Sequence, residues 1–67
     1  MKATYETVTA FARKHGTVKI LDAQGKTRIL PSGDPDSTEL VEKADKFWFQ
    51  DKWYKRGEFE TLLEKPN

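Results

Sequence analysis

The chain has 67 residues, which is enough for one small domain and too few for two, so residues 1–67 are taken as a single domain. Hydrophobic residues make up 36% of the chain and charged residues 34%, and the formal net charge is +1. The absence of cysteine excludes disulfides and cysteine-ligated metal sites. The fold therefore depends on apolar packing, in which two Trp, two Tyr and four Phe are available.

The first predicted element is a helix over residues 5–14, where apolar side chains recur with helical spacing. Thr4 is suited to cap its start, and Gly16 is suited to end it in a left-handed conformation. His15, the single histidine, is interpreted as an exposed residue at the helix end. The side chains expected on the inner face are Tyr5, Val8, Phe11 and Ala12.

A β-hairpin is predicted next, because residues 17–21 and 26–30 both alternate and contain β-branched residues. Between them, Asp22 at the first position and Gly25 at the fourth fit a type I turn. One simple register turns Val18, Ile20 and Ile29 inward and places Leu21 and Leu30 on the other face, but the sequence alone does not fix the pairing.

Residues 31–36 have the composition of a loop, and a short helix is expected to follow it. Asp36 and Glu39 have the spacing of a capping box, which explains these acids better than a metal site does, because the calcium-loop pattern is absent. The alternative is a longer acidic loop that leads into a strand. The residues expected to face inward are Leu40, Val41 and Ala44.

The region from residue 46 to 55 is rich in aromatic residues and predicts a second hairpin, with strands 47–49 and 53–55. Alternation turns Phe47 and Phe49 inward and Trp48 outward. Of Trp53 and Tyr54, one is expected to point each way, and the sequence does not say which.

A final helix is predicted from Gly57 to Lys65, ended by Pro66. The fold class is therefore α+β in the order α-β-β-α-β-β-α. Two antiparallel hairpins are expected to join in one sheet, with the first and last helices covering one face. The predicted core contains Val8, Phe11, Ile20, Ile29, Phe49, Phe59 and Leu62.

Charge is segregated along the chain. Residues 1–33 carry a net charge of +4, residues 34–45 a net charge of -4, and residues 46–57 a net charge of +3. An acidic segment thus separates two basic hairpins, a polarity that can steer a charged partner toward the protein.

The sequence points away from catalysis and cofactors. The glycines are isolated, so no phosphate-binding loop is present, and the lone histidine has no carboxylate placed by sequence to orient it. No stretch approaches the about 20 apolar residues that cross a bilayer, and the first residues do not form an apolar signal core. We expect a cytoplasmic protein that is not an enzyme, does not associate with membranes, and uses no metal or cofactor.

The aromatic hairpin is the feature that points to a function. Aromatic and cationic side chains together are typical of binding surfaces, which predicts a non-catalytic interaction or regulatory module that binds a protein partner, as a monomer or homodimer. The alternative is a nucleic-acid-binding protein that uses the basic hairpins 17–30 and 46–56. The residues predicted to bind a protein partner are Trp48, Lys46, Lys52, Tyr54, Lys55 and Arg56, and those of the alternative are Lys19, Lys26 and Arg28.

Overall fold

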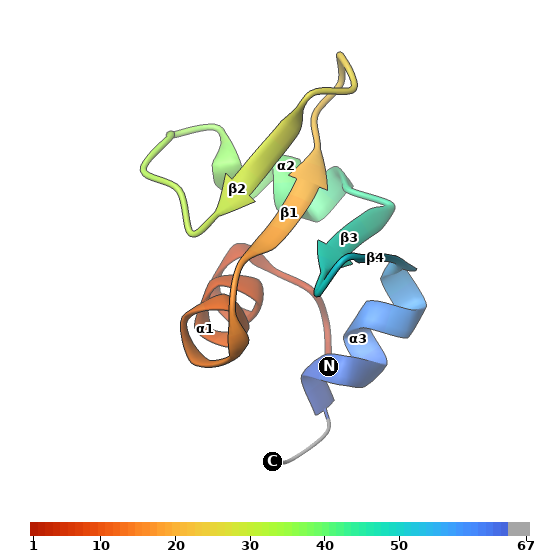
Figure 1. Ribbon diagram of the computed structural model, residues 1–67. Coiled ribbons are helices and arrows are strands. Elements are labelled where there is room, and N and C mark those ends of the chain that lie inside the picture. The colour runs from red at the N-terminus through yellow and green to blue at the C-terminus, as the bar shows by residue number, and fades with distance from the viewer. Residues whose placement is uncertain (65–67) are drawn as a thin grey trace.

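Residues 1–64 are described by a computed structural model, and they fold into three helices and a four-stranded antiparallel sheet (Figure 1). The predicted fold class and element order are confirmed, although the end of the last predicted helix, Lys65 and Pro66, lies outside the described residues. The elements are α1 (Tyr5–His15), β1 (Val18–Leu21), β2 (Thr27–Leu30), α2 (Ser37–Lys43), β3 (Lys46–Phe49), β4 (Lys52–Lys55) and α3 (Arg56–Glu64).

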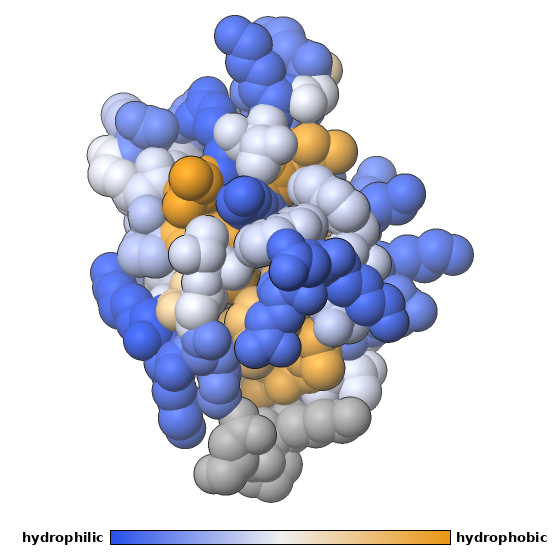
Figure 2. Space-filling view, viewed as in Figure 1, coloured by the Kyte–Doolittle hydropathy of each residue, from blue (hydrophilic) through white to orange (hydrophobic). Residues whose placement is uncertain are grey.

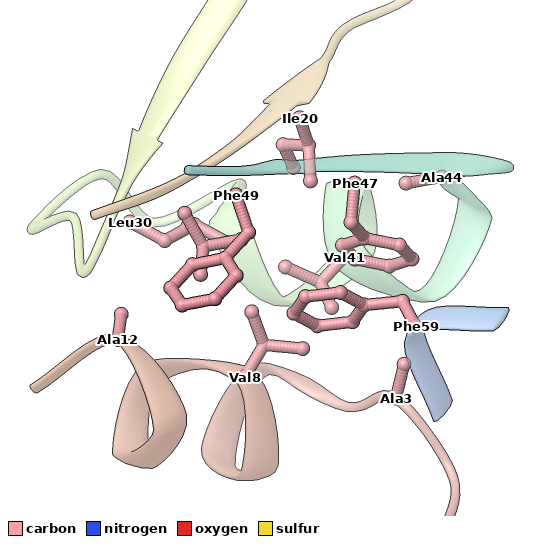
Figure 3. Close-up of a cluster of buried hydrophobic side chains, with 11 residues drawn as sticks. Ala3, Val8, Ala12, Ile20, Leu30, Val41, Ala44, Phe47, Phe49 and Phe59 are labelled. Atoms are coloured by element: carbon pink, nitrogen blue, oxygen red, sulfur yellow. The ribbon is translucent and has the colours of Figure 1, made fainter. Parts of the chain in front are cut away.

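The two hairpins join into one sheet with the strand order β2-β1-β3-β4. The junction is made by β1 and β3, in which Val18 pairs with Phe49 and Ile20 with Phe47. Side chains from all three helices meet the sheet on the same face, including Val8 of α1, Val41 of α2 and Phe59 of α3 (Figure 3). Within residues 1–64, no helix covers the opposite face of the sheet.

Phenylalanine rings fill the centre of the core between the sheet and the helices. Phe59 of α3 stacks on Phe47 with ring centroids 4.8 Å apart, and the partly buried Phe11 of α1 contacts both Phe59 and Phe49 edge to face. Aromatic pairs of this kind stabilise beyond the area that they bury. This packing supplies the cohesion that disulfides would give other small domains.

The first hairpin corrects one predicted core residue. Ile29 is 58% exposed, whereas its neighbour Leu30 is 1% exposed. Asp22 N–H bonds to the Lys26 carbonyl, so the loop contains three residues and ends at Gly25, whose φ is 80°. A type I turn followed by a left-handed glycine adds a bulge, and this pairs Val18 with Leu30 and turns Leu30 inward.

The helix ends agree with the sequence at the start of α1 and differ at its end and at α2. Thr4 caps α1 through a hydrogen bond that its side chain accepts from the Thr7 N–H. Gly16 follows the last turn with a positive φ of 127°, but its ψ of 172° makes it extended and not the left-handed helical residue that is predicted. Asp36 precedes α2 but makes no capping hydrogen bond, so the predicted capping box is wrong. Its carboxylate instead accepts hydrogen bonds from the guanidinium of Arg28.

The second hairpin follows the prediction and resolves its open point. Gln50 and Asp51 form the two-residue turn, both with positive φ, at 49° and 64°. The register pairs Trp48 with Trp53 and Phe47 with Tyr54, so Trp53 points outward and Tyr54 points inward. At the start of α3, the Glu58 carboxylate accepts a hydrogen bond from the Lys55 N–H at 3.0 Å.

None of the helices within residues 1–64 is long and apolar enough to cross a membrane. In the same part of the chain, no three His, Asp or Glu side chains form a group able to hold a metal ion.

Candidate functional site

The uncovered side of the sheet is the candidate functional site, and we call it the outer face. Side chains alternate along each strand, so every second residue points away from the helices. In Figure 2 the exposed apolar surface is divided into patches bordered by hydrophilic side chains. The outer face consists of Lys19 and Leu21 on β1, Thr27 and Ile29 on β2, Lys46 and Trp48 on β3, and Trp53 and Lys55 on β4.

Strand register arranges the centre of the outer face as a row across all four strands. Lys19 pairs with Ile29 on one side and with Trp48 on the other, and Trp48 pairs with Trp53. Neighbouring strands lie about 4.8 Å apart, so adjacent side chains of this row are in contact range. The row therefore presents two indole rings, one aliphatic side chain and one ammonium group to solvent.

The two indoles differ in exposure. Trp53 is 40% exposed, whereas Trp48, on the more central strand, is partly buried. The Lys19 ammonium lies 4.3 Å from the centre of the Trp48 ring, within the range of a cation–π interaction. Trp53 thus offers an open aromatic surface, whereas the Trp48 ring is in contact with the Lys19 ammonium.

The outer face carries positive charge alone. Its lysines are Lys19, Lys46 and Lys55, and none of its eight positions holds a carboxylate. The negative charges of residues 34–45 belong to the loop before α2, to α2 itself and, at Asp45, to the short connection before β3, and α2 lies on the helix side of the sheet. The fold therefore separates a basic aromatic surface from an acidic segment, as the charge pattern of the sequence suggests.

The structure divides the residues predicted to bind a protein partner. Lys46, Trp48 and Lys55 lie on the outer face. Tyr54 points to the core, with its ring centre 6.3 Å from that of Phe59. Lys52 is exposed at the sheet edge on the inner side, where its ammonium lies 5.1 Å from the centre of the Tyr54 ring.

Arg56, the last of that predicted set, is occupied within the fold. Its guanidinium donates hydrogen bonds to the carbonyl oxygens of Ala3 at 3.1 Å, Ala44 at 2.9 Å and Glu42 at 3.0 Å, and also to that of Val41. Two of these carbonyls, those of Val41 and Glu42, belong to the last turn of α2, where the helix dipole favours a cation. Arg56 thus connects α2 to the N-terminal segment.

The residues of the nucleic-acid alternative are also divided. Lys19 joins the outer face beside Trp48, and Lys26 is exposed in the first turn. Arg28 points inward and forms ion pairs with Asp22, Asp34 and Asp36 at 3.2–3.3 Å. Its charge is compensated within the fold and does not add to the outer face.

The Arg28 cluster perturbs the ionisation of its members. The pKa of Asp22 lies below its usual value, because its carboxylate accepts hydrogen bonds from the N–H groups of Lys26 and Gln24 and from Arg28. The pKa of Arg28 is raised, mainly by its hydrogen bonds and charge interaction with Asp36. The cluster holds the first turn and the loop before α2 together.

Four outer-face residues are not among the predicted site residues: Trp53, Ile29, Leu21 and Thr27. The sequence does not fix the face of Trp53, because that face depends on the length of the second turn. The prediction that Ile29 lies in the core holds only for a first turn without the bulge at Gly25. All four can be identified by counting alternate positions along each strand, starting from the turn of its hairpin.

A cleft of about 420 Å³ opens beside the outer face, between the first turn and the junction of α2 with β3. Its lining is mainly apolar, and two of its residues, Leu21 and Lys46, also belong to the outer face. The complete lining is Leu21, Asp22, Ala23, Leu40, Lys43, Ala44, Asp45 and Lys46.

Comparisons with protein-family models, with curated proteins and with solved structures find no match to this chain, so its function is argued from its own geometry.

Proposed function

We propose that the protein is a non-catalytic module that binds single-stranded nucleic acid on its outer face. The observation that carries the proposal is the row of Lys19, Trp48 and Trp53 on adjacent strands, on a face without carboxylates. Proteins that bind single strands combine aromatic surfaces, on which bases stack, with cations that follow the phosphates. A four-stranded sheet with aromatic residues on its open face is an established platform for this purpose.

The geometry suggests how the face would hold a strand. One base stacks on the exposed ring of Trp53, and a second stacks on Trp48 after its cation moves aside. The displaced Lys19 ammonium remains close enough to contact a phosphate. Lys46 and Lys55, paired with each other on β3 and β4, supply two more phosphate contacts beside the indoles.

A protein partner is the second candidate, and the exposed apolar side chains of the outer face favour it. Trp53 is 40% exposed, Leu21 41% and Ile29 58%. Tryptophan is enriched among residues that dominate protein interfaces, but lysine is depleted there. Because three of the eight outer-face positions are lysines, we place nucleic acid first.

The test is a titration of tryptophan fluorescence with a single-stranded oligothymidylate at several salt concentrations. Binding is expected to quench the indoles, and three phosphate contacts predict a slope of log K against log salt of about -2. A duplex of the same length should bind more weakly, because its bases are hidden from the indoles. Absence of binding to any oligonucleotide at low salt would overturn the proposal and favour the protein partner.

A further inference from the structure

We propose that the cleft beside the outer face is a subsite for one unstacked nucleobase that carries an exocyclic amino group. The inference rests on the proposed function, because the base belongs to a strand already held on the outer face. It adds selectivity among bases, which stacking on indoles does not give, since every base has an aromatic face.

Continuity between the two surfaces is the first argument. Leu21 and Lys46 line the cleft and also belong to the outer face. A strand that leaves the indoles past Lys46 therefore reaches the cleft without crossing other surface. Because Lys46 lies on its rim, a phosphate bound by this lysine can place the attached nucleoside over the opening.

The lining gives the second argument. Leu21, Ala23, Leu40 and Ala44 provide apolar walls, and the volume of about 420 Å³ lies within the usual range for small-ligand sites. Flat aromatic rings removed from a stack are commonly held between apolar side chains. The cleft thus has the size and surface suited to a single base.

The polar groups on the rim give the third argument. The Asp22 carboxylate is already engaged by the N–H groups of Gln24 and Lys26 and by Arg28, and the Lys43 ammonium pairs with Glu39 at 2.7 Å.

Asp45 differs from these rim residues. Its backbone carbonyl is fixed by a hydrogen bond from the Arg56 N–H at 2.8 Å, and within residues 1–64 its carboxylate has no hydrogen bond or ion pair. This carboxylate is an acceptor without donor character, so it suits the amino group at the edge of adenine or cytosine. In thymine the single N3–H donor lies between two carbonyl oxygens, which repel a carboxylate, so thymine suits it less well.

The experiment compares the affinities of oligodeoxycytidylate, oligodeoxyadenylate and oligothymidylate of equal length for the protein. We expect the first two to bind at least about tenfold more tightly than oligothymidylate, as one hydrogen bond to a charged group provides. In the Ala23→Phe variant a ring fills the cleft from an exposed turn position, and this preference should disappear while oligothymidylate binding stays unchanged. Ala10→Phe, on the exposed side of α1, is the matched control and should keep the preference.

A second variant tests the acceptor itself. Asp45→Ala should remove the advantage of the amino-bearing bases without lowering the affinity for oligothymidylate, because a repelling charge is lost as well. Equal affinities in the wild type, or a preference that survives both Ala23→Phe and Asp45→Ala, would overturn the cleft proposal and leave the outer face intact. Failure of all three oligonucleotides to bind would overturn the proposed function and the cleft together.

Discussion

The Arg56 guanidinium donates a hydrogen bond to the carbonyl oxygen of Ala3, which lies 53 residues earlier in the chain. The same group also binds the carbonyls at the end of α2 and lies 5.3 Å from the centre of the Phe47 ring. A single cation thus joins the N-terminal segment, α2 and α3 around one core aromatic ring. Its planar arrangement of donors is what allows several acceptors to be satisfied at once.

Arg56→Lys is therefore expected to lower the free energy of unfolding by about 2–4 kcal/mol, because an ammonium cannot replace the several directed hydrogen bonds. Urea unfolding followed by circular dichroism measures the loss. Arg13→Lys, at an exposed position of α1, should change the midpoint little. Equal effects of the two substitutions would show that Arg56 contributes charge and not geometry.

Trp53→Ala is expected to weaken binding of single-stranded oligonucleotides about tenfold, as the loss of one stacked base predicts. Its stability should change little, because the ring is 40% exposed. Trp53→Phe retains an aromatic surface and should keep most of the affinity. The remaining Trp48 reports binding by fluorescence in both variants, and retention of full affinity by Trp53→Ala would remove this ring from the site.

Leu30→Ala and Ile29→Ala test the register of the first hairpin. Leu30 is 1% exposed and packs in the core, so its truncation should cost about 2–4 kcal/mol. Ile29 is 58% exposed, and its truncation should cost less than about 0.5 kcal/mol. Thermal unfolding of the two variants measures both losses of stability. A larger loss for Ile29→Ala than for Leu30→Ala would mean that β2 is shifted by one residue along β1.

Lowering the pH is expected to weaken the Arg28 cluster, because protonation of Asp22 removes its ion pair with Arg28. The folded state lowers the pKa of this carboxylate, mainly through the hydrogen bond from the Lys26 N–H, so it favours the ionised form. The resulting stabilisation is present above the pKa of the unfolded chain and is lost as pH falls through the lower folded value. Asp22→Asn is expected to reduce stability at neutral pH and to flatten its decline below about pH 4. Glu42→Gln, on the exposed surface of α2, should keep the wild-type pH profile in urea unfolding.

The second turn can be improved, because Gln50 and Asp51 both occupy positive φ values that side chains disfavour. Replacing the pair by Asn-Gly, the preferred sequence for this turn geometry, is expected to stabilise the protein by about 1 kcal/mol. Calorimetry measures the rise in the unfolding temperature. Gln24→Asn in the first turn, where φ is not positive, should bring no gain, and destabilisation by the Asn-Gly pair would contradict the assigned backbone geometry.

The sequence predicted the elements well because the information that defines them is local. The spacing of Val8, Phe11 and Ala12 and the cap at Thr4 act within one helix, and both were found. The alternation of Phe47, Trp48 and Phe49 likewise fixed which side of β3 faces the core.

What the sequence missed depends on contacts between elements. Ile29 and Leu30 differ by one position, so a single bulged glycine in the turn decides which of them is buried. Asp36 has the spacing of a cap, but Arg28 of β2 competes for the same carboxylate. Arg56 was predicted to bind a partner because nothing in its local sequence reveals the carbonyls that surround it.

The hydrogen bond from the Lys55 N–H to Glu58 has a consequence for how other chains can approach the sheet. A terminal strand with free backbone groups is a template for further strand addition and aggregation. On β4 the Lys55 N–H already donates to the Glu58 carboxylate, and Lys52 and Lys55 occupy the two ends of the strand. Growth of the sheet on this side is discouraged, so Trp53 can stay accessible to a ligand without making β4 a route to fibrils.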